Sequence, residues 1–223
     1  MFYNYAWLIL SSSGALIGIT GYYLDIVLPG NYGGLLWAAI TGVIAGSGLI
    51  IGSLIRKLSL ISHTDFLTGL WNRRYFYLTL QKQFCQAAAQ RQHLCVAMID
   101  VDGFKTINDT YGHTTGDQLL SGLAALLKKN AGGTVVTRWG GDEFAIIFAG
   151  TTLEKAREVM EKIRRLTETN FLPYQLTISA GVVPLKAGQT LNEFLSQADH
   201  ALYKAKIKKN AIITIIDDEP LIL

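Results

Sequence analysis

The sequence predicts a mixed α/β domain, one layer of sheet covered by helices, preceded by two helices that cross a membrane. Three observations lead to this prediction. Before Arg56 there is no Lys or Arg and a single acid, Asp25, whereas charged residues are frequent afterwards. From about Ser59 onward, stretches with helical spacing alternate with short apolar stretches typical of strands. Gly140 and Gly141 join two of these strands as an antiparallel hairpin, and this mixed order favours a single helix-covered sheet.

Residues 5–23 and 35–55 carry no charge, and each approaches the about 20 residues that a helix needs to cross a bilayer. We therefore predict two transmembrane helices within residues 1–55. A cleaved signal peptide is the alternative for the first, but it needs a basic N-terminal region, which is absent. Arg56 and Lys57 directly follow the second helix, so the positive-inside rule places this end in the cytoplasm.

We expect a multi-pass protein of the inner (cytoplasmic) membrane, with residues 56–64 as a short linker and residues 65–223 as a cytoplasmic domain. Three glycine pairs in the predicted membrane helices have the small-xxx-small spacing that lets helix backbones approach closely in lipid. They either pack the two helices of one chain together or associate two copies. The pairs are Gly14 with Gly18, Gly42 with Gly46, and Gly48 with Gly52.

The composition excludes some classes of protein. Cys85 and Cys95 both fall on the predicted cytoplasmic side, where thiols stay reduced, so no disulfide is expected. The net charge of +3 is too small to indicate a nucleic-acid partner, and no basic cluster interleaved with aromatic residues is present.

The periodicity of the remaining chain predicts helices and strands in alternation. Thr151 and Glu154 have the spacing of a capping box at the start of the third helix. Helices are predicted at 76–92, 116–129, 153–166 and 191–208, and strands at 93–100, 134–139, 143–148, 174–183 and 211–216.

Acidic residues cluster at the end of one predicted strand and at the hairpin bend. Asp100 and Asp102 are two residues apart on a strand, which places them on one face, and Asp142 follows the two glycines of the bend. Two such charges about 4 Å apart near a protein surface repel by about 4 kcal/mol. Mg²⁺ would relieve this repulsion, because it takes oxygen ligands and keeps water and substrate phosphates as the others. The pattern therefore indicates phosphoryl or nucleotidyl transfer.

Structural roles are the alternative for these acids. Asp102 has the position of an N-cap for a helix that opens at Gly103, which would need no metal. Asp142 and Glu143 have the chemistry of solvated turn residues.

The stretch RWGGDEF, residues 138–144, resembles the signature of the GGDEF domain of diguanylate cyclases. The resemblance extends over nearly the whole predicted cytoplasmic domain, in the family's order and approximate spacing. The other matching stretches are DFLTGLWNRR (65–74), DVDGFKTINDTYGHTTGDQLL (100–120), LTISAGVV (176–183) and ADHALYKAK (198–206).

The resemblance implies a sheet like the palm of nucleotide polymerases and class III nucleotidyl cyclases. It also implies an enzyme in which two GTP molecules condense to cyclic di-GMP and release two pyrophosphates, with each half-site on one domain of a homodimer. Asp100, the carbonyl of Val101 and Asp142 would then hold Mg²⁺. Asp142 would also accept the proton of the ribose 3′-hydroxyl, and Lys105 would stabilise the transition state.

The family match also assigns nucleotide contacts. The N–H groups of Gly103, Phe104 and Lys105 open a helix and would face phosphate, since helix N-termini favour anions. An acidic side chain suits the N1–H and amine of guanine, and an amide suits O6 and N7, so GTP should be preferred over ATP. The positions that match the family's nucleotide contacts are Asn108, His113, Asp117 and, for phosphate, Lys206.

Within the signature, Gly140 and Gly141 permit the bend and leave room for a nucleotide, and Phe144 belongs to the strand predicted at 143–148. Strand alternation predicts that Glu143 turns away from the face of Asp142, and its role is left open. The inhibitory product site RxxD of many family members is replaced by residues 131–134, AGGT, so feedback at that site is not expected. The family's AKxxGRN ending reads AKIKKN here, which leaves a second phosphate-binding base open.

Two other functions fit the same sequence. The domain could be a catalytically silent GGDEF module that binds GTP or a partner protein in signalling. The chain could also be a membrane scaffold with no affinity for nucleotides.

Overall fold

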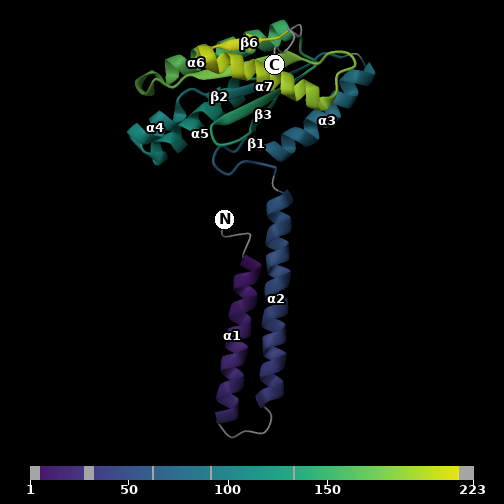
Figure 1. Ribbon diagram of the computed structural model, residues 1–223, viewed down its shortest axis with the longest axis vertical. Helices are drawn as coiled ribbons and strands as arrows, with labels where there is room; N and C mark the ends of the chain where they lie inside the picture. The colour runs from purple at the N-terminus through teal and green to yellow at the C-terminus, as the bar shows by residue number, and fades with distance from the viewer. Residues whose placement is uncertain (1–5, 28–32, 62, 91, 133, 216–223) are drawn as a thin grey trace, which may run out of the picture. The chain divides into compact units, whose positions relative to one another are not determined.

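The computed structural model forms two compact units, Met1–Ser62 and His63–Leu223 (Figure 1). It describes residues 6–27, 33–61, 63–90, 92–132 and 134–215.

The first unit is a pair of packed helices, α1 (Ala6–Val27) and α2 (Gly33–Ile61). Of the described helices, one is long and apolar enough to cross a membrane, through the stretch Trp37–Ile55 of α2. The α1 helix does not meet this criterion, so the second membrane crossing remains a prediction. The α2 helix also continues to Ile61, through most of the segment 56–64 predicted as a linker.

Two of the three glycine pairs named above differ in their surroundings. A Cβ atom added to Gly14 or Gly18 would collide with Ile44 or Thr41 of α2, so this pair lets the two helices approach. A Cβ atom on Gly42 or Gly46 would meet nothing within 4 Å. The first pair therefore packs the hairpin, whereas the second has no partner among the described residues.

The second unit contains a six-stranded sheet in the order β1-β3-β4-β2-β5-β6. Neighbouring strands are antiparallel in the centre, and the two edge strands, β1 and β6, run parallel to their neighbours. The strands are β1 (Trp71–Asn72), β2 (Leu94–Val101), β3 (Val135–Arg138), β4 (Glu143–Ala149), β5 (Ile178–Pro184) and β6 (Ile212–Thr214). The predicted mixed α/β sheet covered by helices is confirmed.

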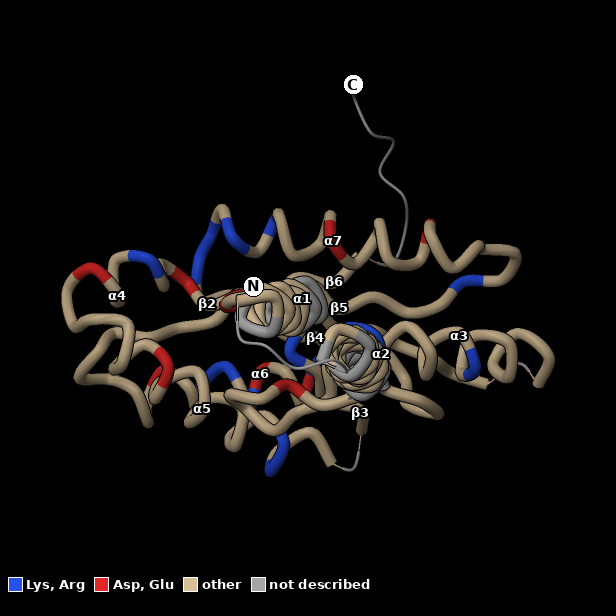
Figure 2. Tube along the Cα trace, turned by 90° about the horizontal axis from the view of Figure 1, so that it is seen from below, with Lys and Arg blue, Asp and Glu red and all other residues tan. Residues whose placement is uncertain are grey.

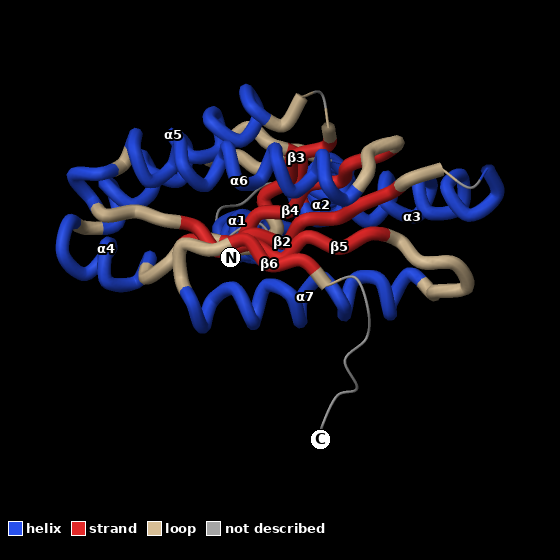
Figure 3. The backbone as a smooth tube through the Cα atoms, turned by 90° about the horizontal axis from the view of Figure 1, so that it is seen from above, coloured by secondary structure: helices blue, strands red, loops and turns tan. Residues whose placement is uncertain are grey.

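Helices cover both faces of this sheet (Figure 3). The α4 (Phe104–Tyr111), α5 (His113–Asn130) and α6 (Leu153–Asn170) helices pack on one face, where they share a core with Cys95, Ala97 and Ile99 of β2. The α3 (Arg73–Gln90) and α7 (Leu191–Lys208) helices pack on the other face, with Val96 and Met98. Because strand residues alternate between faces, Asp100 belongs to the face covered by α3 and α7.

Local signals explain where the helices begin. Thr190 and Glu193 form a complete capping box at the start of α7, with each side chain bonded to the other's backbone N–H. At α6 the cap is Thr152, whose hydroxyl accepts a hydrogen bond from Lys155 N, so the predicted capping box of Thr151 and Glu154 is wrong by one residue.

Two predicted boundaries shift for identifiable reasons. The strand predicted at 174–183 begins only at Ile178, because Pro173 lies in a 3₁₀ turn, Leu172–Tyr174, that ends at Gln175 with a positive φ of 51°. Gly112, at a φ of 83°, separates α4 from α5, and α5 therefore starts at His113, three residues earlier than predicted.

Candidate active site

Acidic residues from β2 and from the β3–β4 hairpin lie together at one end of the sheet. Asp100, near the end of β2, is only 4% exposed, and it lies directly opposite Glu143 of β4. Opposite residues of an antiparallel pair have Cβ atoms about 5 Å apart on the same face, where like charges destabilise the sheet. A positive group is therefore needed at this position.

Lys206, on the last turn of α7, supplies a positive charge. Its Nζ donates a hydrogen bond to Asp100 Oδ2 at 2.8 Å, and its side chain is 49% exposed. Burial raises the pKa of Asp100 above its ordinary value, and this outweighs the lowering by Lys206, while Asp142 and Glu143 raise it further. Burial lowers the pKa of Lys206, but Asp100 and the other two acids outweigh burial, so its pKa is raised.

Glu143 lies on the same face of the sheet as Asp100. Its neighbours along β4 on the same side, Ala145 and Ile147, pack in the core under α3 and α7, which is the face of Asp100. Asp142 lies in the bend before β4 and is not part of the strand, so the side to which it turns does not follow from strand alternation. Burial raises the pKa of Asp199 on α7, and the charge of Glu143 raises it further.

Backbone hydrogen bonds fix the hairpin beside the end of β2. Val101 N donates to Asp142 O at 3.2 Å, so the metal-binding positions expected on β2 and on the hairpin are joined directly. Trp139 N and Gly140 N both donate to Glu143 O, at 2.8 and 3.3 Å, which closes the bend.

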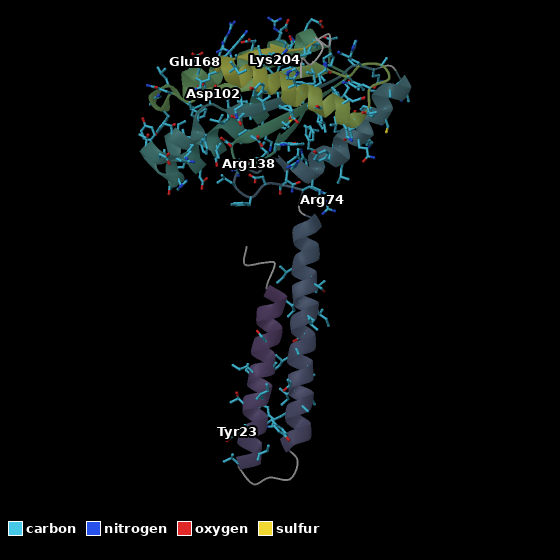
Figure 4. All side chains as sticks on the ribbon, in the orientation of Figure 1. Tyr23, Arg74, Asp102, Arg138, Glu168 and Lys204 are labelled. Carbon is cyan, nitrogen blue, oxygen red and sulfur yellow. The ribbon has the colours of Figure 1, made fainter. Side chains whose placement is uncertain are left out.

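Arg138, which is labelled in Figure 4, is bonded to the backbone of the hairpin. Its Nη2 and Nε donate to Gly141 O at 2.7 and 3.1 Å, and its Nη1 donates to the carboxylate of Asp65 at 3.1 Å. Burial by itself raises the pKa of Asp65, but hydrogen bonds from Thr68 and Arg138 outweigh it and lower the pKa below its ordinary value. This ion pair is partly buried, with side chains 13% and 17% exposed, and it links the start of the domain to the bend.

Asp102 does not cap the helix that follows it, and this alternative from the sequence is wrong. The N-cap of α4 is Gly103, with a φ of 66° and no side-chain bond. The carboxylate of Asp102 instead accepts hydrogen bonds from Thr177 Oγ1 and Ser179 Oγ of the β5 region, and from Asn210 N.

The α4 helix begins directly after these acids. Gly103 precedes it in a left-handed conformation, Phe104 is buried in the core, and Lys105 is exposed on the first turn. Since Gly103 offers no side-chain cap, the first N–H groups of α4 are available to an anion.

The predicted nucleotide positions lie on α4 and α5. Asn108 Oδ1 is buried and has no hydrogen-bond partner among the described residues. It lies against Gly116 of α5, where any side chain would collide with it. His113 and Asp117 are exposed on the first two turns of α5. A buried acceptor without a partner is costly unless a ligand or water supplies the hydrogen bond.

The donor set at the end of β2 suits Mg²⁺. Asp100 and Asp142 offer carboxylates and Val101 offers a carbonyl, and all three are hard oxygen ligands of the kind that Mg²⁺ prefers. In the described part of the chain no three His, Cys, Asp or Glu side chains converge as a complete metal cage. Mg²⁺ does not require one, because it usually keeps water and substrate phosphates in its coordination shell.

The comparison with known proteins decides the family. The model of the family described as "Diguanylate cyclase, GGDEF domain" matches residues 62–211. The chain belongs to the GGDEF-domain family.

Relatives in this family include the probable diguanylate cyclase DgcC of Escherichia coli K12, which is 39% identical over 157 residues, 68% of this chain and 42% of that protein. Diguanylate cyclase DgcM of the same strain is 38% identical over 157 residues, covering 69% of this chain and 38% of DgcM. The chain thus spans about two fifths of the length of these relatives.

Solved GGDEF structures share the fold. The GGDEF domain of DgcB from Caulobacter crescentus, in complex with c-di-GMP, aligns with a TM-score of 0.63 at 31% identity, over 68% of this chain and 92% of that one. The active GGEEF domain of a diguanylate cyclase from Vibrio cholerae aligns with a TM-score of 0.62 at 34% identity, over 66% and 98%.

Sequence reasoning missed the contacts that support this GGDEF site. The Asp65–Arg138 pair and the hydrogen bonds of Asp102 both join residues far apart in the chain. A signal was present, since both Asp65 and Arg138 lie within stretches that match the family. Arg73 is a further case: its guanidinium lies 4.5 Å from the ring centroid of Trp139 at the base of the hairpin.

Proposed function

We propose that the chain is a membrane-attached, Mg²⁺-dependent diguanylate cyclase that acts as a homodimer. Two GTP molecules would condense to cyclic di-GMP and release two pyrophosphates. The observation that carries this proposal is the meeting of Asp100, the Asp142 hairpin and Lys206 at the end of β2, in a chain of the GGDEF family.

The reacting groups are assigned to residues of the β2 end and the hairpin. Asp100, the Val101 carbonyl and Asp142 would hold Mg²⁺, which supplies charge neutralisation for the reacting phosphate when bound. Asp142 would accept the 3′-hydroxyl proton as the ribose oxygen attacks the α-phosphorus of the second GTP and pyrophosphate leaves. Lys105, exposed on α4, would stabilise the negative charge that develops during this transfer.

Binding of GTP is assigned to the helices that follow. The N–H groups at Gly103, Phe104 and Lys105 would contact phosphate, and Lys206 would exchange part of its bond with Asp100 for a phosphate oxygen. The residues assigned to contacts with the base are Asn108, His113 and Asp117. A site with such polar pairs rejects the wrong base by about 10⁴-fold, because the unmatched groups are left without partners.

Dimer formation and membrane attachment complete the proposal. One domain supplies one half-site, so two domains must face each other across two GTP molecules. A membrane anchor on each copy confines the domains to one surface, which raises their effective concentration. The α2 helix, with its apolar stretch Trp37–Ile55, is the candidate anchor.

Product analysis tests the proposal. The full chain in detergent, given GTP and Mg²⁺, should form cyclic di-GMP and two equivalents of pyrophosphate, detected by liquid chromatography with mass spectrometry. Asp142→Asn should abolish product, and ATP should not replace GTP. Nucleotide binding without pyrophosphate release would instead support a silent GGDEF module, and absence of binding would support a scaffold.

A further inference from the structure

The carboxylate of Asp102 takes no part in the chemistry proposed above, yet it gathers three segments of the chain. Its Oδ1 accepts a hydrogen bond from Ser179 Oγ at 2.7 Å. Its Oδ2 accepts from Thr177 Oγ1 and from the backbone N–H of Asn210, each at 2.8 Å. The end of β2, the start of β5 and the turn between α7 and β6 are thereby joined at one side chain.

The turn that Asp102 holds has an unfavourable backbone conformation. Lys209, the residue after α7, has a φ of 56° and a ψ of 156°, and Asn210 has a φ of 45°. The first of these combinations is essentially restricted to glycine, and such strain persists only where the surroundings enforce it. A hydrogen bond from Asn210 N to a charged acceptor is a strong restraint of this kind.

The side chain of Asn210 extends the network to α6. Its Oδ1 accepts a hydrogen bond from Arg164 Nη1 at 2.8 Å, and its Nδ2 donates to Glu168 Oε1 at 2.9 Å. Asp102 and Glu168 are both labelled in Figure 4. The turn is thus attached to the sheet by its backbone and to α6 by its side chain.

Lys206 lies four residues before Asn210, on the last turn of α7. Ala205 O accepts a hydrogen bond from Lys209 N at 2.9 Å and lies 3.4 Å from Ser179 Oγ, whose proton goes to Asp102, so the end of the helix adjoins the same network. Movement of the turn would move the last helical turn and would change the distance between Lys206 and Asp100. Asp102 and Asp100 lie two residues apart at the end of β2. The same strand end therefore carries the residue that holds the turn and the residue that pairs with Lys206.

We propose that Asp102 is a positioning residue: by fixing the 209–210 turn, it holds the Lys206 ammonium beside Asp100, where it binds a phosphate oxygen of the nucleotide. The phosphate role of Lys206 depends on the function proposed above. The fixing of the turn does not depend on it. The two parts can therefore be tested separately.

The first test is a double-mutant cycle on nucleotide affinity, measured by calorimetry on the full chain in detergent with Mg²⁺ and a non-hydrolysable GTP analogue. Asp102→Asn should weaken binding by about tenfold, as loss of supporting partners commonly does. In a Lys206→Met background the same change should have an effect below about twofold, because coupled residues do not act additively. Equal weakening in both backgrounds would overturn the proposal, because Asp102 would then act through the fold in general.

Thr177→Val is the matched control, because it removes one donor to Asp102 and keeps the bond from Asn210. The affinity of this variant for the GTP analogue should stay within about twofold of the wild-type value, as expected for a site not coupled to Lys206. If it weakens binding as much as Asp102→Asn, the contact with β5 carries the effect and the proposal is wrong.

The second test needs no nucleotide. Amide hydrogen exchange of the free protein should show faster exchange at Asn210 N–H in Asp102→Asn, with exchange in β2 unchanged. Unchanged protection at Asn210 would overturn the fixing of the turn. A wild-type chain that binds no analogue would overturn the proposed function and the phosphate role of Lys206. The exchange experiment would still decide whether Asp102 fixes the 209–210 turn.

Discussion

The two cysteines differ in their environment and should differ in reactivity. Cys95 is buried near the start of the central strand β2, and burial, followed by the charge of Glu154, raises its pKa to about 12. Cys85 is exposed on α3. Because the thiolate is the nucleophile, a maleimide at neutral pH should label Cys85 in the folded protein and Cys95 only after denaturation. Peptide mass mapping checks this, and rapid labelling of native Cys95 would contradict the burial.

The ion pair of Asp65 and Arg138 should make stability depend on acid pH. The folded-state pKa of Asp65 is lowered, so its contribution is present above the unfolded value of 3.8 and is lost as the pH falls through the folded value. Asp65→Asn should lower the free energy of unfolding by about 1.5–3 kcal/mol at neutral pH, as for hydrogen bonds to charged groups. The difference from wild type should shrink below a pH of about 4.

Urea unfolding of the full chain across this pH range measures that difference. Asp109→Asn, at an exposed site on α4, is the control and should have little effect at any pH. A deficit for Asp65→Asn that stayed constant down to low pH would show that its charge is not what stabilises the hairpin.

At the residue scale, the sequence identified the residues that meet at the candidate site. It did not identify the contacts that hold those residues in place. The motif match singled out Asp100, Asp142 and Lys206, and the structure brings the last within 2.8 Å of the first. The Asp65–Arg138 contact spans 73 residues of sequence and depends on the parallel pairing of β1 with β3, which periodicity could not reveal.

At the element scale, Gly181 determines how closely α7 packs on the sheet. A Cβ atom at this position in β5 would lie 2.6 Å from Ala198 O, within the backbone of α7, which cannot shift without moving the helix. Gly181→Ala should therefore cost about 1–3 kcal/mol of stability, as overpacking does. Gly141→Ala, in open space at the hairpin bend, should leave thermal unfolding nearly unchanged. Equal melting temperatures for the two variants would contradict this packing.

The elements themselves were largely predictable, and the exceptions have physical causes. The α7 helix has the predicted bounds because its capping box and its apolar stripe agree. The two-residue β1 is too short to produce a period, so only pairing with β3 reveals it. The start of β5 was misplaced because a 3₁₀ turn carries apolar residues that imitate a strand.

At the scale of the whole molecule, charges of both signs lie along the helices of the second unit (Figure 2), whereas the described part of the first unit is almost wholly uncharged. This asymmetry predicted the division into two units, and it supports attachment to a membrane. It gave no information on how the first unit associates.

The glycines of the first unit allow that association to be tested. Gly18→Leu should disrupt the packing of α1 on α2, because Thr41 occupies the space that a side chain would need. Gly42→Leu combined with Gly46→Leu should leave this packing intact but lower self-association in a bilayer, since small residues let helices of two copies approach. Crosslinking in nanodiscs measures both, and unchanged self-association of the second variant would contradict a role in dimer formation.

The most direct test of the account is the affinity for a divalent cation at the end of β2. In calorimetric titrations of the full chain with Mg²⁺ and a non-hydrolysable GTP analogue, the wild type should bind the cation. Asp100→Asn and Asp142→Asn should each reduce that binding by more than about tenfold, as loss of a charged oxygen ligand predicts. Cation binding that is unchanged in both variants would contradict the assignment of these carboxylates to a metal site and the nucleotidyl transfer built on it.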